Sequence, residues 1–309
     1  MNILITGIHG FVGANLVAAL ETNHTIYGLD IIAPPKDGVI KTFSWDEISE
    51  IPEIDTIIHL AGKAHDTKNQ TEAQVYFDIN TGLTQKIYDW FLQSSAKKFI
   101  FFSTVKAAAD TVAGGFLTED VIPTPKGPYG ESKIAAENYI LQFLPIDKSV
   151  YILRPAMIHG PGNKGNLNLL YKVVKKGIPY PLGAFENRRS FTSIDNISFV
   201  VEQLIIQDIP TGVYNVADDE SLSTNELIKL IASTSGKRSK IWHWSPQLIR
   251  MCAQIGTKLH LPLNNERLQK LTENYVVCNN KIKSAMGIDK MPVSAKNGFE
   301  KTIQSFERK

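Results

Sequence analysis

Residues 2–13 of the chain read NILITGIHGFVG, and this stretch decides the fold. The apolar run at its start is typical of a buried β-strand, and a helix is expected from Phe11 to about Leu20. Glycines between a strand and a helix let the backbone turn tightly and approach a pyrophosphate, to which the helix N-terminus offers N–H donors. The stretch therefore predicts a dinucleotide-binding turn, with a plain strand–helix turn as the alternative. The residues expected to contact the cofactor here are Gly7, Gly10, Phe11, Val12 and Gly13.

The alternation of strand and helix patterns continues through the first half of the chain. Further β-rich runs occur at 25–30, 56–61, 98–103 and 150–154, with helical patterns between them. Runs that are apolar throughout predict strands covered on both faces, as in a parallel sheet. We therefore expect an α/β protein with a Rossmann-like, doubly wound parallel sheet and a smaller C-terminal substrate-binding lobe.

The rhythm changes after about residue 160. Glycine, proline and asparagine cluster at 161–168 and 177–187, which is typical of loops. Later residues predict short strands and helices without the regular strand–helix alternation of the first half. The expected units are a dinucleotide-binding domain at 1–160, a smaller substrate-binding lobe at 161–309, and a segment near 189–215 that returns to the first domain.

Asp30 ends the second β-rich run. A carboxylate at this place accepts hydrogen bonds from a ribose 2′-OH and repels a 2′-phosphate. Residues 31–33 offer no arginine to hold such a phosphate. The sequence therefore predicts NAD rather than NADP as the cofactor, with a turn aspartate as the alternative.

Tyr129 and Lys133 lie four residues apart in the run PYGESK, residues 128–133. On a helix they share one face, so the phenol and the ammonium can enter the same pocket. An ammonium beside a phenol favours the phenolate and lowers the tyrosine pKa from its usual value of about 10. A tyrosine in that state takes a proton from a sugar hydroxyl or returns one to a ketone. Alone the spacing is a weak signal, because it also occurs by chance on solvated helices.

Composition and charge are those of an ordinary soluble globular protein. The 309 residues are 43% hydrophobic and 21% charged, and the formal net charge of +2 gives no basic field for nucleic acid. Two cysteines without metal-site spacing predict reduced thiols. The sequence shows no signal-peptide pattern and no apolar run of the roughly 18 residues that a membrane span needs. We therefore expect a cytoplasmic protein with no nucleic-acid or membrane partner.

The segment 241–263 carries tryptophans and aliphatic residues. Membrane-surface contact is one explanation for them, and a core-facing helix between Pro246 and Pro262 is the other. The helical spacing of the apolar residues favours the core-facing helix.

The assembled motifs resemble the extended short-chain dehydrogenase/reductase family, in its nucleotide-sugar epimerase/dehydratase branch. The resemblance follows family order and spacing over the first 162 residues and continues more loosely to the C-terminus. It is specific for the fold and the cofactor chemistry and far less so for the sugar. The matching positions are the turn 6–13, Asp30, 59–62, Asn80, 103–104, Tyr129 with Lys133, 153–155 with 159–162, and 188–191.

The resemblance implies roles for residues around the tyrosine–lysine pair. Thr104 corresponds to the family's catalytic serine or threonine, whose hydroxyl holds the sugar O4. With Tyr129 and Lys133 it would form the catalytic set, and Lys133 would also hold the nicotinamide ribose. The further cofactor contacts that the resemblance implies are Leu60, Ala61, Gly62 and Asn80.

The resemblance also implies substrate contacts. Arg189 corresponds to the arginine that neutralises the sugar-nucleotide diphosphate, with adjacent Arg188 as the alternative. A surface charge before a strand stays open for either arginine, as does plain solvation for Lys106. The other expected substrate contacts are His65, Lys106, Asn166 and Arg267.

Two departures from the family pattern narrow the chemistry. Nucleotide-sugar 4,6-dehydratases have Asp-Glu directly after the catalytic threonine, whereas this chain has Val105 and Lys106. Loss of water needs those two proton carriers, so dehydration is not expected. The family's usual Val-Tyr-Gly is replaced by alanines at 107–109, which removes a common aromatic on the substrate side.

The expected function is NAD-dependent C4 epimerisation of a UDP-hexose or UDP-N-acetylhexosamine through a transient 4-keto sugar. The runs 162–166 and 179–183 resemble a bacterial subgroup that modifies UDP-N-acetylhexosamines for surface polysaccharides. That subgroup contains C4 epimerases and 4-keto-sugar reductases, so a reductase is the close alternative. A non-catalytic dinucleotide-binding sensor is the alternative of another class.

Two expectations concern partners. Helical patterns near 72–93 and 129–144 carry apolar residues on more than one face, and the family often dimerises through these helices, so a homodimer or two deeply buried helices are both open. His59 ends an apolar strand without further ligands at metal spacing, so no metal site is expected.

Overall fold

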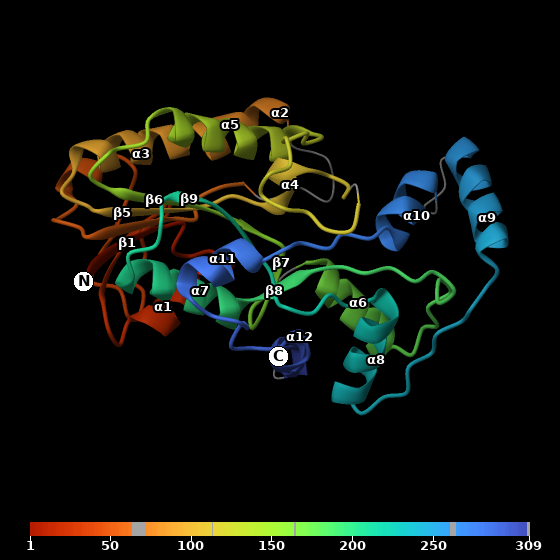
Figure 1. Cartoon of the computed structure of the whole chain (residues 1–309). Helices are drawn as coiled ribbons and strands as arrows, with labels where there is room; N and C mark the ends of the chain where they lie inside the picture. Colours follow the sequence, from red (N-terminus) through yellow and green to blue (C-terminus); the bar gives the residue numbers. More distant parts are fainter. Residues whose placement is uncertain (64–71, 113, 164, 260–263, 308–309) are drawn as a thin grey trace.

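The computed structural model describes residues 1–63, 72–112, 114–163, 165–259 and 264–307 (Figure 1). Its centre is a sheet of seven parallel strands in the order β3-β2-β1-β4-β5-β6-β9. The expected Rossmann-like parallel sheet is therefore confirmed. The strands are β1 (Asn2–Thr6), β2 (Thr25–Leu29), β3 (Thr42–Phe43), β4 (Thr56–His59), β5 (Lys98–Phe102), β6 (Ser149–Pro155) and β9 (Gly212–Val216).

Helices cover both faces of this sheet (Figure 1). One face carries α1 (Phe11–Leu20), α7 (Ile194–Ile206) and α11 (Asn280–Met286). The opposite face carries α3 (Leu83–Gln93) and α5 (Pro128–Gln142). The chain crosses from one face to the other between β1 and β4, which makes the sheet doubly wound.

Alternating strand residues build the two cores. In β1, Ile3 and Ile5 pack in the cluster under α1 and α7, whereas Leu4 packs in the cluster under α3 and α5. In β5, Ile100 joins the first cluster, and Phe99 with Phe101 joins the second. Because successive side chains point to opposite faces, a strand buried on both sides must be apolar at every position. This requirement explains the unbroken apolar runs in the sequence.

The single helix expected at 72–93 is divided into three parts. A short α2 (Ala73–Tyr76) leads into a π-helical turn, η2 (Phe77–Gly82), and α3 follows. Thr84 donates its hydroxyl to Asn80 O at 2.6 Å, and Thr81 donates to Ser132 O of α5 at 2.9 Å. Side chains that bond to backbone carbonyls are a usual cause of such irregular turns. The expected helical segment is therefore present, with an irregular turn inside it that places Asn80 beside the loop after β4.

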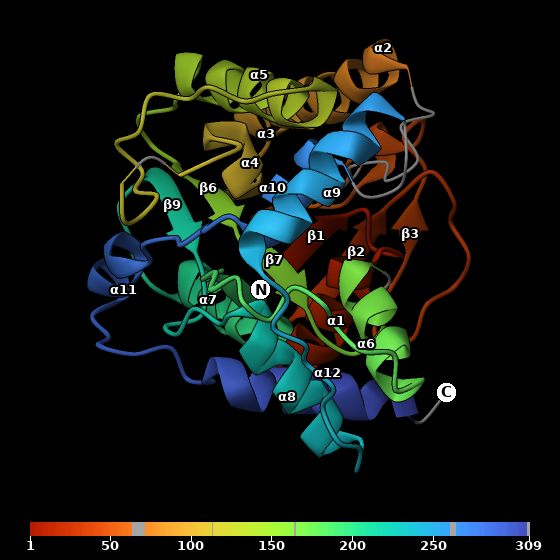
Figure 2. The same cartoon turned by 90° about the vertical axis from the view of Figure 1, so that its right-hand side faces the viewer.

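A second group of elements lies beyond the carboxyl ends of the strands (Figures 1 and 2). A two-stranded parallel sheet pairs β7 with β8. The proposed division at residue 160 and the return of 189–215 stay predictions, although β9 pairs with β6 in the main sheet. The remaining elements are η1 (Ile48–Glu50), α4 (Val105–Ala108), β7 (Met157–His159), α6 (Asn166–Lys175), β8 (Phe191–Ser193), α8 (Thr224–Thr234), α9 (Pro246–Lys258), α10 (Asn265–Thr272) and α12 (Ala295–Glu307).

The helix expected in 241–263 is α9, but most of its apolar side chains do not face a core. Its buried residues are the small set Ile249, Ala253 and Gly256, which pack near Leu182 and Leu268. Its larger apolar residues are exposed to solvent, so the expectation of a core-facing helix is wrong for them: Leu248, Met251 and Ile255. Among the described helices, none has both the length and the apolarity needed to cross a membrane.

Candidate active site

The expected functional residues meet at one edge of the sheet, where β1, β2, β4 and β5 end (Figures 1 and 2). All four strands are parallel, so their carboxyl ends lie at the same edge. The connections leave β1 and β4 towards opposite faces, and open sheets bind ligands in the crevice at such a point. This geometry places the glycine turn, Asp30, Thr104 and the face of α5 in one region.

The glycine turn is closed by backbone contacts that leave no room for side chains. Gly7 has φ +68°, and a Cβ there would lie 2.8 Å from Ala61 N. A Cβ on Gly13 would lie 2.7 Å from Gly7 O and 2.8 Å from Ile8 Cα. Gly7 therefore sets the turn and the approach to the β4 loop, and Gly13 lets α1 pack onto the turn.

The N-terminus of α1 suits a phosphate. Its N-cap, Gly10, has no side chain to accept from the first-turn N–H groups, and no acidic residue stands in that turn. The N–H groups of Phe11, Val12 and Gly13 therefore face the crevice with the positive end of the helix dipole. His9 Nε2, in the same turn, is buried and has no hydrogen-bond partner. These donors fit the diphosphate of a dinucleotide.

Asp30 lies directly against the glycine turn. Its Oδ2 accepts from His9 N at 3.1 Å, and its Oδ1 accepts from Ile31 N at 2.8 Å. The carboxylate is 9% exposed and keeps acceptor capacity beyond these two bonds. This position, one strand away from the phosphate-binding turn, is where a ribose diol of NAD would be held.

A buried chain of hydrogen bonds fixes the loop after β4. Thr6 Oγ1 accepts from Ala61 N at 3.0 Å and lies 2.7 Å from His59 Nδ1, while His59 Nε2 lies 2.9 Å from Thr84 Oγ1. Because Thr84 gives its own proton to Asn80 O, His59 Nε2–H is the donor to Thr84. Burial, and secondarily Lys133, holds the pKa of His59 well below its usual value. His59 is thus a neutral structural residue that positions Leu60 and Ala61.

Asn80 joins this loop to α5. Its Oδ1 accepts from Lys63 N at 2.7 Å, and its Nδ2 donates to Ser132 Oγ at 3.0 Å. A Cβ on Gly62 would lie 2.8 Å from Asn80 Oδ1 and 3.1 Å from Lys133 Nζ. Gly62 therefore packs closely against Asn80 of the π-helical turn and against Lys133 of α5.

Lys133 is buried in the wall of the site. Its Nζ donates to Phe102 O at 2.9 Å and lies 4.8 Å from the centre of the Phe101 ring. Burial lowers the pKa of Lys133 to about 8, and the negative charge of Glu137 opposes this shift. A lysine held in this way is charged at neutral pH but costs stability to keep charged.

Tyr129 and Thr104 meet across the site. The Thr104 side chain lies close enough to the phenol of Tyr129 to lower its pKa, and its Oγ1 accepts from Lys106 N at 3.2 Å as the N-cap of α4. Burial is the largest influence on Tyr129 and raises its pKa above 10.0, whereas the Thr104 hydrogen bond lowers it and Tyr76 raises it. The expected lowering of the tyrosine pKa by Lys133 is therefore wrong, and the ammonium is bonded to Phe102 O.

Sequence reasoning missed a buried ion pair behind Lys133. Arg154 Nη2 lies 2.6 Å from Glu137 Oε2, and Ser103 Oγ donates to the other oxygen of this carboxylate. Glu137 is fully buried one helical turn after Lys133, so its charge faces the ammonium. The available signal was Arg154, since an arginine within an apolar strand requires a buried partner.

The Lys106 ammonium is neither free in solvent nor directed towards Tyr129. Its Nζ lies 3.3 Å from Asp110 Oδ1 and 4.6 Å from the centre of the Tyr275 ring. The Tyr275 hydroxyl reaches Ala109 O at 2.7 Å and Val105 O at 3.1 Å. A tyrosine from near the C-terminus therefore fixes the turn that replaces the dehydratase acid pair, and substrate contact by Lys106 stays a prediction.

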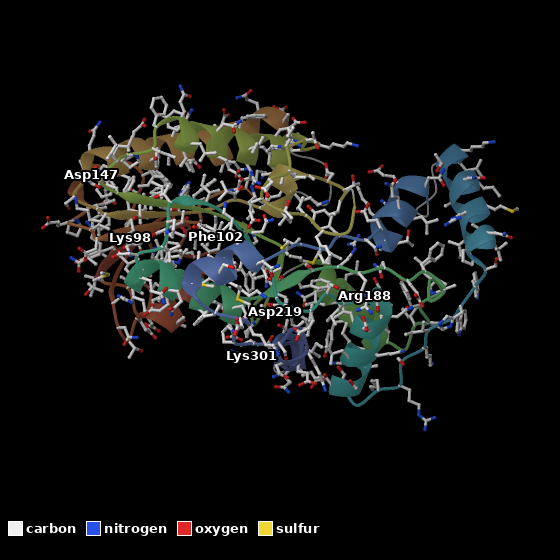
Figure 3. All side chains as sticks on the ribbon, viewed as in Figure 1. Lys98, Phe102, Asp147, Arg188, Asp219 and Lys301 are labelled. Carbon is white, nitrogen blue, oxygen red and sulfur yellow. The ribbon has the colours of Figure 1, made fainter. Side chains whose placement is uncertain are left out.

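The adjacent arginines point to different surroundings. Arg188 Nη1 bonds Ser221 O at 3.1 Å and Glu226 at 3.3 Å, and the side chain is largely exposed (Figure 3). Arg189 Nη2 bonds Lys270 O and lies 3.6 Å from Glu273 Oε1, while its Nε is buried without a hydrogen-bond partner. Burial lowers the pKa of Arg189, and Glu273 opposes this. Of the pair, Arg189 is the residue that has a buried donor without a hydrogen-bond partner.

Three expected substrate contacts are less defined. Arg267 is an exposed residue of α10, the helix that Arg189 also contacts through Lys270 O. Asn166 is the first residue of α6. His65 lies outside the described residues. Within the described part of the chain, no three His, Cys, Asp or Glu side chains gather closely enough to hold a metal ion.

Comparisons with known proteins agree with this geometry. The sequence model of the NAD dependent epimerase/dehydratase family matches residues 3–217. The chain is 31% identical to the UDP-glucose 4-epimerase of Vibrio cholerae, over 99% of this chain and 95% of that protein. It is 26% identical to the N-acetyl-alpha-D-glucosaminyl-diphospho-ditrans,octacis-undecaprenol 4-epimerase of Escherichia coli O157:H7, over 78% of this chain and 75% of that one. The solved structure of MoeE5 with UDP-glucuronic acid and NAD superposes with a TM-score of 0.78 at 22% identity, over 100% and 99% of the two chains.

Proposed function

Because the chain belongs to the NAD-dependent epimerase/dehydratase family, we propose that it interconverts the C4 epimers of a UDP-hexose or UDP-N-acetylhexosamine through a transient 4-keto sugar. The observation that supports the proposal is the nearness of the Thr104 side chain to the Tyr129 phenol, at the same edge of the sheet as the glycine turn. The UDP-glucose 4-epimerase named above supports a UDP-linked substrate and the C4 position.

In this mechanism Tyr129 moves the proton of the sugar O4. Thr104 lies against the phenol, so its hydroxyl orients O4 and stabilises the tyrosine when it has lost its proton. Bound NAD would supply the acceptor and donor of the C4 hydride, and its positive nicotinamide ring would favour the phenolate. Lys133, fixed by Phe102 O and facing Glu137, holds the ribose hydroxyls beside that ring.

Other residues bind the two ligands. The uncapped start of α1 and the turn at Gly7 hold the cofactor diphosphate, and Asp30 holds the adenine ribose. Arg189, with its free buried Nε, binds the diphosphate of the sugar nucleotide. The 4-keto sugar then turns about that anchored diphosphate before the hydride returns.

Dehydration is excluded from the proposal by the composition of α4. The two positions after Thr104 are Val105, which is buried, and Lys106, which is engaged by Asp110 and Tyr275. Neither side chain carries the carboxylate needed to add or remove a proton across C5 and C6. Oxidation and reduction at C4 need only the tyrosine, the threonine and the lysine.

The test is incubation of the purified protein with UDP-glucose, UDP-N-acetylglucosamine and the matching UDP-4-keto sugars. Products are followed by NMR and the cofactor by absorbance. An epimerase gives the C4 epimer with no net change in cofactor absorbance. Stoichiometric consumption of NADH or NADPH with a 4-keto sugar would assign the reductase instead, and no turnover of any sugar would leave a dinucleotide-binding sensor.

A further inference from the structure

One apolar surface has no partner among the residues that the structure describes. It is formed by α9, its C-cap Leu259 and the preceding strap 236–245, and we call it the α9 surface. Residues 248, 251, 255 and 259 recur at helical spacing and so share one face of the helix. They lie away from the narrow buried face of Ile249, Ala253 and Gly256.

The side chains of this surface are large and open to solvent. Trp242 and Trp244 stack on each other with ring centres 5.9 Å apart, just before the helix begins. Exposed fractions lie between 45% and 63% for all six of its large apolar residues: Trp242, Trp244, Leu248, Met251, Ile255 and Leu259. Scattered single apolar residues are common on protein surfaces, but a helical face joined to a tryptophan pair marks an interaction site.

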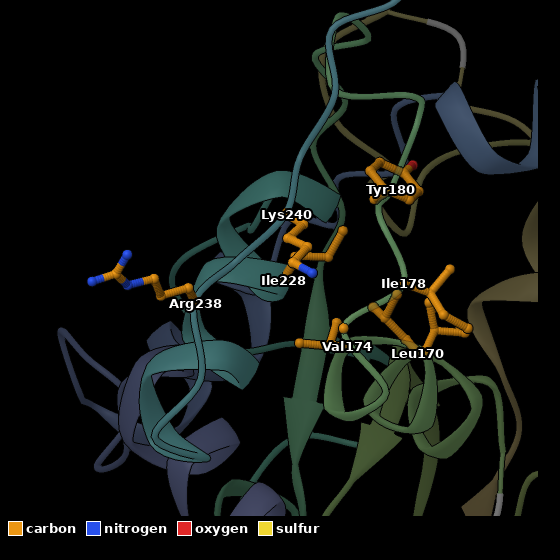
Figure 4. Close-up of a pocket in the computed structure, with 9 residues that line it drawn as sticks. Leu170, Val174, Ile178, Tyr180, Ile228, Arg238 and Lys240 are labelled. Atoms are coloured by element: carbon orange, nitrogen blue, oxygen red, sulfur yellow. The ribbon is translucent and has the colours of Figure 1, made fainter.

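The charged residues in the segment that carries this surface are all basic. Between Glu226 and Glu266 the chain has six basic residues and no acidic one: Lys229, Lys237, Arg238, Lys240, Arg250 and Lys258. The whole chain has a formal net charge of only +2, so the rest of the molecule is net acidic. Figure 4 shows Arg238 extending away from the apolar residues that line the hollow beneath the strap. On α9 itself, Arg250 and Lys258 accompany the apolar face, and the helix has no acidic residue.

This combination selects among possible occupants. A second copy docked through the same surface would bring like charges together, which opposes association. A short helix with an exposed aliphatic face, flanking lysine and arginine, and tryptophans at one end has the composition of helices that lie in the plane of a lipid interface. Basic residues beside such a helix are attracted to anionic headgroups.

We propose that the α9 surface binds the surface of a bilayer that contains anionic lipid. Leu248, Met251, Ile255 and Leu259 enter the headgroup region, the tryptophans lie at its boundary, and Arg250 and Lys258 reach the phosphates. This revises the expectation that the chain has no membrane partner. It does not depend on the reaction proposed above.

The position of the surface gives the contact a consequence. Helix α9 lies at the extremity of the molecule, beyond the carboxyl ends of the strands where the site is built (Figures 1 and 2). A protein docked through α9 therefore presents that edge of its sheet towards the membrane.

The test is co-sedimentation of the full chain with vesicles of phosphatidylcholine alone or of phosphatidylcholine with phosphatidylglycerol. We expect binding to the anionic vesicles that weakens as salt rises, and little binding to the neutral ones. The double variant Met251→Glu/Ile255→Glu should bind at least about tenfold more weakly. Lys258→Gln should bind about fivefold more weakly, as expected for one basic residue near an anionic surface.

Matched controls separate the surface from general effects. Ile146→Glu makes the same change at a fully exposed residue, and Lys97→Gln removes an exposed lysine paired with Asp147 at the other end of the molecule (Figure 3). Both should bind vesicles like the wild type, and every variant should keep wild-type turnover of a soluble sugar nucleotide. Equal binding by the double variant and the wild type, or no binding to anionic vesicles, would overturn the proposal. A concentration-dependent dimer lost in the double variant would also do so, by assigning the surface to a second copy.

Discussion

The crevice edge of the sheet and the outer edge around α9 and α10 are built in opposite ways. At the sheet edge, polar groups are buried and joined to one another, as in the run from Thr6 through His59 and Thr84 to Asn80. Around α9, most large apolar groups are exposed, and the buried residues of the helix are Ile249, Ala253 and Gly256. The first arrangement fixes reacting groups in place, while the second leaves a surface for another body.

The difference shows which features of this chain lower the stability of its fold. Keeping Lys133 charged at 5% exposure and Glu137 fully buried is unfavourable unless each has partners. The exposed face of α9 is unfavourable in another sense, because its apolar area stays in water. Both costs are explained by function rather than by folding, and each can be probed by substitution.

The largest effect is expected at the phenol. Tyr129→Phe removes the group that moves the O4 proton, and general acid–base assistance of this kind contributes about 10²- to 10⁴-fold. We expect kcat to fall at least about a hundredfold while NAD still binds, because the glycine turn is untouched. Steady-state rates and cofactor titration measure the two quantities, and near wild-type kcat would refute the assignment of Tyr129.

The next effect concerns the buried ion pair. Glu137→Gln leaves the Arg154 guanidinium buried without a counter-charge, so the free energy of unfolding should fall by about 3 kcal/mol. Urea unfolding measures this. Glu131→Gln on the same helix is the control, since Glu131 is exposed and its amide can still accept from Gly127 N. If the two variants were equally stable, the buried ion pair between Glu137 and Arg154 would not stabilise the fold as described.

A smaller effect is expected on the substrate side. Arg189→Ala should raise KM about tenfold or more with little change in kcat, because a charge-assisted bond to the diphosphate is lost. Arg188→Ala is the matched control, since that side chain bonds only Ser221 O and Glu226 at the surface and should leave KM within about twofold. A reversed result would make Arg188 the anchor.

The smallest effect is a gain. Burial lowers the pKa of Lys133 from 10.5 to about 8, which corresponds to a cost of about 3 kcal/mol at neutral pH. Lys133→Met removes this cost but leaves Phe102 O unbonded, so we expect a net gain of about 1 kcal/mol with loss of activity. The unfolded chain binds more protons than the folded one between pH 8 and 10.5, so wild-type stability rises there. The advantage of the variant should therefore shrink from pH 8 upwards, and unfolding at several pH values tests it.

Local motifs explain what the sequence made predictable. The strands that end at the crevice and the helix from Phe11 to Leu20 follow from apolar runs and glycine spacing, so β1 and α1 have the expected bounds. Thr104 and Tyr129 meet because Thr104 follows the end of β5 and Tyr129 lies on α5, the helix that covers this strand. These features depend only on contacts between neighbouring elements.

Long-range contacts explain what the sequence did not reveal. The Lys106 ammonium contacts the ring of Tyr275. Arg189 is held by Lys270 O and Glu273. These three partner residues all come from the far end of the chain. The π-helical turn at Asn80 depends on bonds to α5. Met251 is exposed because the opposite face of α9 packs against Leu182 and Leu268. Apolar residues recur at helical spacing on both faces, so the sequence alone does not show which face is buried.

The most direct test of hydride transfer at C4 uses a UDP-sugar that carries deuterium at C4. The protein is incubated with it in ordinary water, and in parallel with unlabelled sugar in deuterium oxide, and the products are examined by NMR. If Tyr129 and NAD act as proposed, the deuterium stays at C4 of the epimer and none enters C4 from the solvent. Loss of the label, or its appearance from deuterium oxide, would show that a proton rather than a hydride leaves C4, and would contradict the mechanism.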